Sequence, residues 1–121
     1  MKRKILYVDD EEVLVQLGKD LLSDFGYEVI CAYSGEQALG LLELHQGSIE
    51  LLITDESMPG ISGIELAQKV YLLAPDLPVI LCSGHMLTMR EKGLEKTNVR
   101  NVLIKTEACM KLPEIIEKLL A

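Results

Sequence analysis

Short apolar runs of strand length alternate along this chain with longer stretches whose apolar residues recur at helical spacing. This change of period predicts strands that are each followed by a helical or weakly helical stretch. The strands are nearly continuous apolar runs, as is typical of parallel strands covered by helices on both faces. We expect strands at residues 4–8, 27–32, 51–54, 79–82 and 102–104.

The first two helices have recognisable ends and faces. Gly26 suits the position that follows a helix, and Ser34 and Gln37 have capping-box spacing at the start of the next one. Val13 and Val15 lie off the predicted core stripe of the first helix and are candidates for a docking surface. That stripe is predicted to comprise Leu14, Leu17, Gly18, Leu21 and Phe25.

The remaining helices complete a repeated βα order. Helical spacing resumes at residues 64–71, residues 86–96 predict a weak helix at best, and a last helix carries its stripe at residues 112–119. Pro113 is expected in the first turn of that last helix, where proline is tolerated. The order predicts an α/β fold in three layers, a doubly wound five-stranded parallel sheet formed as (βα)5.

Composition excludes several classes of protein. The 121 residues form one expected domain, residues 1–121, without repeats or linkers. The net charge of −7, the absence of Trp and the lack of a Lys/Arg block argue against direct nucleic-acid binding. No apolar run approaches the roughly 20 residues of a membrane span. Cys31, Cys82 and Cys109 are too widely spaced for a zinc motif, and we expect reduced thiols and a cytoplasmic location.

Polar side chains follow four of the predicted strands. The first strand ends in Asp9-Asp10, the third in Asp55, the fourth in Ser83 and the fifth in Lys105. Ligands of doubly wound sheets bind at the carboxyl ends of the strands. If the first and third strands are neighbours, the three aspartates meet in one pocket, with the lysine and the serine approaching from the other side.

Three carboxylates in one pocket resist simultaneous ionisation. Two unit charges 4 Å apart repel by about 4 kcal/mol at an effective dielectric constant near 20. Mg²⁺ would relieve this repulsion, because it prefers oxygen ligands and combines one or two carboxylates with a phosphate. Lys105 supplies a positive charge suited to a phosphoryl oxygen, and the Asp55 carboxylate could accept the phosphoryl group as a nucleophile.

The motifs at these strand ends resemble those of response-regulator receiver domains of two-component signalling, over the whole chain. The matching segments are ILYVDDE at residues 5–11, LITD at residues 52–55 with Met58, Pro59, Gly60 and Gly63 after it, PVILCSG at residues 78–84, and LIK at residues 103–105. Each segment alone is a weak signal, but four in this order are specific. The resemblance implies a flavodoxin-like strand order of 2-1-3-4-5.

The resemblance also implies the role of each site residue. Asp55 would take phosphate from a phosphohistidine of a sensor histidine kinase or a histidine phosphotransfer protein. Mg²⁺ would be held by Asp9, Asp10, Asp55 and the backbone carbonyl of Ser57. Lys105 would pair with the phosphoryl group and Ser83 would donate its hydroxyl to it.

The same resemblance describes a signalling module rather than a turnover enzyme, with at most slow self-dephosphorylation. The signal would be relayed by a conformational change at the face of the fourth and fifth strands. The output domain or downstream partner is left undefined, and a homodimer is a family option. Ser57 and His85 occupy variable positions that tune the lifetime of the phosphoryl bond, and Glu56 is expected to face solvent.

Two positions depart from the family pattern. Thr106 stands where the family has a proline with a cis peptide bond, so the loop is either trans and reshaped or strained. Val102 replaces the aromatic residue of the family's switch. These departures motivate an alternative, a receiver-like binding platform that works without phosphorylation.

Two other classes of protein are alternatives, a phosphatase that also has an aspartate after its first strand and a flavin carrier of the same fold. A metal-dependent phosphatase of the haloacid-dehalogenase type requires a D-x-D motif, whereas residues 9–12 here are DDEE. A flavin carrier needs small hydroxyl-bearing residues around a phosphate in its first loop, which four consecutive acids would repel.

Overall fold

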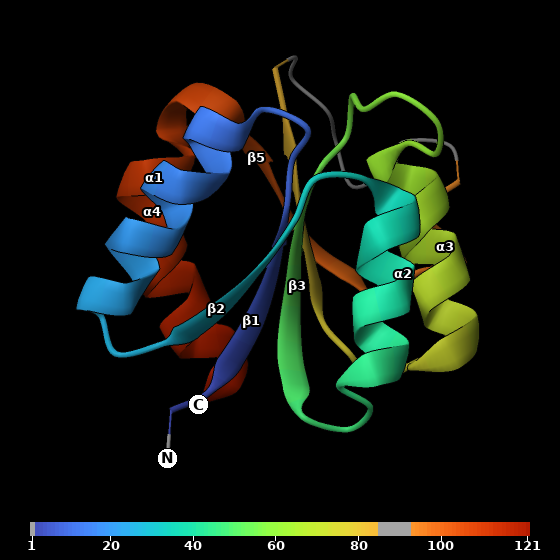
Figure 1. Ribbon diagram of the computed structural model, residues 1–121, viewed down its shortest axis with the longest axis horizontal. Helices are drawn as coiled ribbons and strands as arrows, with labels where there is room; N and C mark the ends of the chain where they lie inside the picture. The colour runs from blue at the N-terminus through green and yellow to red at the C-terminus, as the bar shows by residue number, and fades with distance from the viewer. Residues whose placement is uncertain (1, 85–92) are drawn as a thin grey trace.

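The computed structural model describes residues 2–84 and 93–121. Strands and helices alternate from β1 to β4, and β5 runs directly into the last helix (Figure 1). The elements are β1 (Lys4–Val8), α1 (Glu12–Asp24), β2 (Glu28–Ala32), α2 (Gly35–Leu44), β3 (Ile49–Asp55), α3 (Gly63–Leu73), β4 (Val79–Ser83), β5 (Val99–Ile104) and α4 (Lys105–Leu120).

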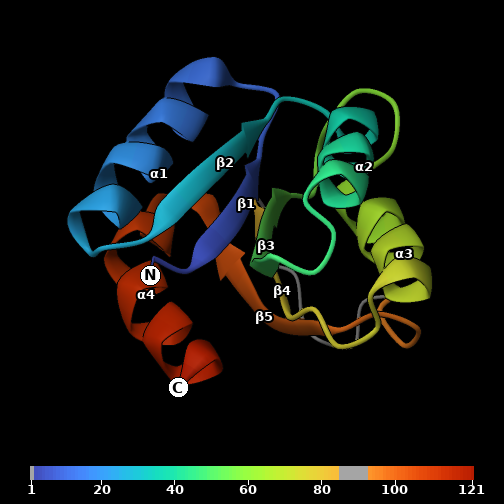
Figure 2. The same ribbon diagram turned by 60° about the horizontal axis from the view of Figure 1, so that its bottom comes forward.

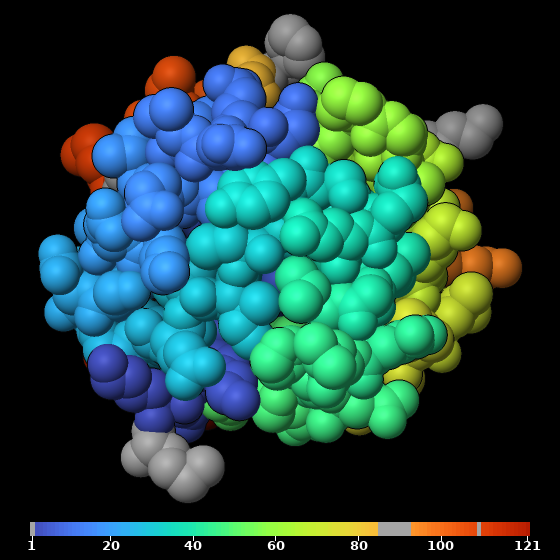
Figure 3. All heavy atoms as spheres, in the orientation of Figure 1, coloured from blue at the N-terminus to red at the C-terminus, as the bar shows by residue number. Residues whose placement is uncertain are grey.

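The five strands form one parallel sheet in the order β2-β1-β3-β4-β5, which confirms the predicted fold class. Helices α1 and α4 cover one face and α2 and α3 the other, giving three layers (Figures 1 and 2). In the space-filling view, side chains of α1, β2 and α2 largely cover the central strands (Figure 3). No helix among the described residues combines the length and the apolar character needed to cross a bilayer.

Alternate residues of the central strands supply two hydrophobic cores, one on each face of the sheet. Ile5 and Ile53 pack toward α1 and α4, whereas Leu6 and Leu52 pack toward α2 and α3. Every residue of β3 except Glu50 is buried. Helices therefore cover both faces of β1 and β3, and only the ends of these strands offer polar groups to a ligand.

Helix α1 presents a different face to the sheet from the one predicted. Its buried residues are Val15, Gly18 and Leu22, whereas Leu17 and Phe25 are exposed. Gly18 belongs to both faces and meets the ring of Tyr7 on β1, where an added Cβ would lie 2.6 Å from Tyr7 Cζ. The burial of Val15 excludes it from any docking surface, while Val13 stays 72% exposed.

The last helix also begins earlier than predicted. Helix α4 starts at Lys105, immediately after β5, so Pro113 lies inside the helix and not in its first turn. The buried stripe extends back by one turn, from Leu112 and Ile116 to Ala108. Across the described residues no peptide bond is cis, so the chain after Lys105 is trans and directly helical.

Two further expectations can be compared with the structure. The predicted cap of α2 is present, since Ser34 Oγ accepts the Gln37 N–H at 3.0 Å, while Gln37 Oε1 accepts the Tyr33 N–H at 2.8 Å. Of the weak helix predicted at residues 86–96, residues 86–92 lie outside the described part, and residues 93–96 form turns.

Candidate functional site

The carboxyl ends of the central strands bring the predicted site residues to one edge of the sheet, the upper edge in Figure 1. Asp9 follows β1, Asp55 ends β3, and Ser83 ends β4. Lys105 enters from the junction of β5 and α4. Parallel strands with a common direction therefore produce the convergence that the sequence predicted.

Lys105 joins two of the aspartates directly. Its Nζ lies 3.0 Å from Asp9 Oδ2 and 3.3 Å from Asp55 Oδ2. Asp10 belongs to the same group, because one carboxylate oxygen from each of Asp9, Asp10 and Asp55 lies within 4.8 Å of the others. The cluster has an open side, since Asp10 is exposed while Asp9 and Asp55 are buried.

Asp55 is the most constrained member of the cluster. It is only 3% exposed, and its Oδ1 has no hydrogen-bond partner among the described residues. Burial raises the pKa of the Asp55 carboxyl, and the neighbouring charge of Asp9 raises this pKa further. Lys105 and the backbone N–H of Ser57 oppose this rise. The site therefore holds a buried carboxylate with one free oxygen.

Asp9 and Lys105 form the supporting pair. Burial raises the pKa of Asp9, against the lowering effect of the Glu11 N–H, which donates to Asp9 Oδ1 at 3.0 Å. The pKa of Lys105 is raised above its ordinary value because the two aspartates outweigh the effect of its burial. Lys105 is therefore a permanent cation at neutral pH.

Ser83 and Ser57 occupy the positions expected from the sequence. Ser83 is buried at the end of β4, one residue beyond Cys82, which pairs with Asp55 in the sheet. Ser57 is exposed, two residues after Asp55 in the loop that leads to α3. Val102 is half-buried within β5. His85 lies outside the described residues.

Two acidic side chains near the site differ from what the sequence predicts. Glu11 is a candidate helix-capping acid by its position, but it makes no side-chain cap, and its Oε1 lies 3.4 Å from Lys105 Nζ. Glu56 was expected to face solvent; instead it is partly buried, and its Oε1 accepts the Ile64 N–H at the start of α3 at 2.8 Å. The local sequence carries no signal for this contact, because Glu56 and Ile64 lie eight residues apart across an irregular loop.

Gly63 has a steric role that its spacing from Asp55 alone does not reveal. A Cβ at this position would lie 2.3 Å from the Asp55 carbonyl oxygen and 2.7 Å from Leu81 Cδ1. Only glycine fits where α3 begins against the backbone of the site. The glycine of the matching motif is therefore explained by the close approach of α3 to β3.

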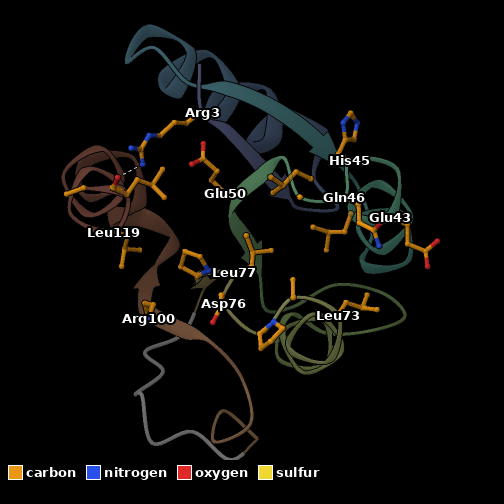
Figure 4. A pocket seen from close by; sticks show the side chains of 18 residues that line it. Arg3, Glu43, His45, Gln46, Glu50, Leu73, Asp76, Leu77, Arg100 and Leu119 are labelled. Atoms are coloured by element: carbon orange, nitrogen blue, oxygen red, sulfur yellow. Dashed lines mark hydrogen bonds between the residues drawn. The ribbon is translucent and has the colours of Figure 1, made fainter. Parts of the chain in front are cut away.

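One large cavity is remote from this chemistry. It has a volume of about 670 Å³ and lies at the opposite, amino-terminal edge of the sheet (Figure 4). Arg3 donates there to the carbonyl of Leu120, and acidic and basic residues are mixed on an apolar floor. A smaller cavity of about 70 Å³ adjoins Asp9, Asp55 and Lys105. We assign the site to the smaller cavity because charged groups converge there and a buried oxygen lacks a partner.

The chain matches known proteins over nearly its full length. Residues 5–117 match the model of the response regulator receiver domain. The transcriptional regulatory protein CpxR of Escherichia coli is 43% identical over 93 residues, which are 77% of this chain and 36% of CpxR.

Solved structures agree with this match. The response regulator protein TrrA of Thermotoga maritima, solved in complex with Mg²⁺-BeF, is 33% identical with a TM-score of 0.85, covering 98% of this chain and 99% of TrrA. A receiver domain protein of Clostridium thermocellum is 30% identical with a TM-score of 0.87, covering 96% of this chain and 92% of that one.

The curated relatives are longer than this chain. The chain spans 36% of CpxR, 38% of the Bacillus subtilis regulator YrkP and 11% of the rice regulator-like protein PRR37. The match therefore concerns one domain of those proteins. The fold and the acidic cluster agree with the sequence match. The chain therefore belongs to the response regulator receiver domain family of two-component systems.

Proposed function

We propose that this domain receives a phosphoryl group on Asp55 from a phosphohistidine of a sensor histidine kinase or a histidine phosphotransfer protein. One observation carries the proposal. Asp55 is a buried carboxylate with one unpartnered oxygen, and its other oxygen lies 3.3 Å from the ammonium group of Lys105. This is the arrangement that an acceptor needs, a nucleophile that is desolvated and paired with a cation.

The transfer needs little chemistry beyond positioning and charge neutralisation. A carboxylate oxygen of Asp55 attacks phosphorus, the P–N bond to the donor histidine breaks, and the released imidazole nitrogen keeps the bonding electrons and takes up a proton. Lys105, already within 3.4 Å of three carboxylates, then pairs with a phosphoryl oxygen. Ser83, at the end of the adjacent strand, donates its hydroxyl to another phosphoryl oxygen.

The residues present fit a magnesium ion. Asp9, Asp10 and Asp55 bring their oxygens within 4.8 Å of one another, and the unpartnered Asp55 Oδ1 is a free ligand atom. Hard oxygen donors of this kind suit Mg²⁺. We propose that these three carboxylates hold it together with the Ser57 backbone carbonyl. When bound, the ion neutralises charge that accumulates on the phosphoryl oxygens.

The output of the domain departs from the pattern of the family. Val102 cannot swing inward as an aromatic switch residue does, so we propose that the signal leaves through the face of β4 and β5 by another rearrangement. The domain acts as a signalling module, with self-dephosphorylation as its slow reverse step.

Labelling with radioactive acetyl phosphate and Mg²⁺ tests this function. We expect up to one phosphoryl group per chain, none in Asp55→Asn, and none when EDTA removes the metal. Asp20→Asn, an exposed change on α1, is the matched control and should label normally. Label that persists in Asp55→Asn would refute the assignment of the acceptor.

The alternatives give different results in the same assays. Absence of label in a folded protein, with a partner affinity that is unchanged by beryllofluoride, would favour the phosphorylation-independent binding platform. Continuous turnover of an aryl phosphate would favour the metal-dependent phosphatase.

A further inference from the structure

Glu56, the residue directly after the proposed phosphoacceptor, closes the loop that leads to α3. Its side-chain Oε1 accepts the Ile64 N–H at 2.8 Å, and its backbone carbonyl accepts the Gly63 N–H at 2.9 Å. Both bonds span residues 57–62, so a single residue ties the beginning of the loop to its end.

The first turn of α3 is fully satisfied as a result. Besides these two amides, the Glu65 N–H donates to Ser62 Oγ at 3.1 Å, and Glu65 Oε1 accepts the Ser62 N–H. Helix N-terminal amides normally lack backbone partners inside the helix. Glu56 supplies the acceptor for two of the three amides of residues 63–65, and its negative charge lies at the positive end of the helix dipole.

The same contact presses α3 against the backbone of the site. At Gly63 a Cβ would lie 2.3 Å from the Asp55 carbonyl oxygen and 2.8 Å from Glu56 Cα. The start of α3 therefore has no room to approach further. The start of α3 also cannot move away from Glu56 without losing both of its hydrogen bonds to that residue.

Ser57 begins the loop that these contacts close. Its backbone N–H acts on the Asp55 carboxyl and lowers the pKa of that group. The Ser57 N–H shares one peptide plane with the Glu56 carbonyl, which accepts the Gly63 N–H. A tilt of this peptide would therefore turn the Ser57 N–H relative to Asp55 and displace the start of the next peptide, which carries the Ser57 carbonyl.

We propose that Glu56 is a positioning residue of the phosphoacceptor site, which sets the affinity for Mg²⁺ by fixing the Ser57 backbone through its two bonds to α3. This inference rests on the proposed function, which assigns Mg²⁺ to the three aspartates and Ser57. It adds a residue that touches neither metal nor phosphate. The geometry of its side chain, and not its charge, is the property that matters.

Three variants and one control test this proposal by calorimetric titration of the intact chain with MgCl₂. Glu56→Ala removes the side-chain acceptor and should weaken Mg²⁺ binding about tenfold, the lower end of the effect of losing an outer partner of a metal ligand. Glu56→Gln keeps an oxygen acceptor and should retain most of the affinity. Glu56→Asp keeps the charge but is too short, so it should behave like the alanine variant.

Ser34→Ala is the matched control, because it removes the side-chain cap of another helix, α2, and deletes neither bond from Glu56 to α3. We expect normal Mg²⁺ affinity in this variant. As a second readout, hydrogen exchange at the amides of residues 57–64 should become faster in Glu56→Ala and stay slow in Glu56→Gln. Unfolding in urea verifies that each variant is folded.

Each outcome decides one hypothesis. Equal Mg²⁺ affinity in Glu56→Ala and Ser34→Ala would overturn the positioning role while leaving the proposed function in place. Normal binding in Glu56→Asp together with weak binding in Glu56→Gln would also overturn it, because charge would then be the cause. No saturable Mg²⁺ binding by the unsubstituted chain would refute the metal site itself, and the inference with it.

Discussion

Lys105 lies closer to Asp9 than to Asp55, with Nζ–Oδ2 distances of 3.0 Å and 3.3 Å. The lysine of the site is therefore shared, and its first partner is a proposed metal ligand. If the proposed site binds Mg²⁺, the ion competes with Lys105 for Asp9. The proposed function then predicts that metal binding leaves the ammonium group available to a phosphoryl oxygen.

Replacement of Lys105 tests how much this pair stabilises the fold. Lys105→Met leaves two buried carboxylates without their cation, and removal of one partner from a buried pair costs roughly 3–5 kcal/mol. Because Lys105 is 22% exposed, we expect a smaller loss, about 2 kcal/mol, in metal-free urea denaturation. Added Mg²⁺ should reduce this loss.

Lys111→Met provides the comparison for that experiment. Lys111 pairs with Glu107 at 2.8 Å on the exposed side of α4, and such pairs contribute less than about 0.5 kcal/mol. If both lysine variants lose the same stability, the Lys105 pairs are no more than surface contacts.

The raised pKa values of Asp9 and Asp55 predict how stability depends on pH. Above the ordinary value of 3.8 and up to the raised values, the folded protein binds more protons than the unfolded chain. The free energy of unfolding therefore falls as pH rises through that window. Lys105 adds no slope there, because it is protonated in both states well below pH 10.5.

Asp55→Asn isolates the contribution of one carboxyl to this slope. As the pH rises from about 4 toward neutral, we expect the metal-free protein to lose stability relative to Asp55→Asn. At pH 7 the variant should be about 1 kcal/mol more stable, because it lacks the buried ionised oxygen that has no partner. Urea denaturation in EDTA at a series of pH values measures the difference. If the difference in unfolding free energy between the two proteins does not change with pH, the raised pKa of Asp55 is wrong.

The contact between Gly63 and Asp55 predicts a steric effect on the site. Gly63→Ala forces a Cβ against the Asp55 carbonyl oxygen and should cost about 2 kcal/mol, as overpacking usually does. It should also weaken Mg²⁺ binding, because α3 and the loop must move away from β3. Denaturation and calorimetric titration measure the two effects separately.

Gly40→Ala is the matched glycine variant. Gly40 lies in α2, and a Cβ there meets nothing within 4 Å, so alanine should stabilise the helix by about 0.5–1 kcal/mol. A Gly63→Ala variant that gains stability in the same way would show that α3 is not held against the site.

The rotation of α1 predicts opposite results for two neighbouring valines. Val15 is fully buried, so Val15→Ala should cost about 2 kcal/mol of unfolding free energy. Val13 is 72% exposed, so Val13→Ala should change stability by less than about 0.5 kcal/mol. Small losses in both variants would instead support the face predicted from the sequence, because neither valine lies on it.

The sequence predicted the strands and their polar ends well because both depend on local patterns. A run such as Leu51–Ile53 is too apolar for the surface, and the charge of Asp55 marks where the apolar run of β3 ends. Parallel strands end at one edge, so the meeting of Asp9, Asp55 and Lys105 followed from the fold class.

The same patterns misplaced the core face of α1. This helix has apolar residues on two adjacent stripes, and periodicity alone cannot rank them. The packing of α1 on the sheet buries Val15 and Leu22 and leaves Leu17 and Phe25 exposed, and that packing joins elements that the sequence describes separately.

Local sequence by itself therefore determined the order of elements, the fold class and the charged residues at the strand ends. These features depend on the spacing of apolar residues along the chain and on residue type. Tertiary structure alone decided the partners of the charges: that Lys105 is shared by Asp9 and Asp55, and that Glu56 turns toward α3 instead of solvent. The physical reason is that an ion pair or a hydrogen bond depends on distances of a few ångströms between residues far apart in the chain, which only the packed helices and strands fix.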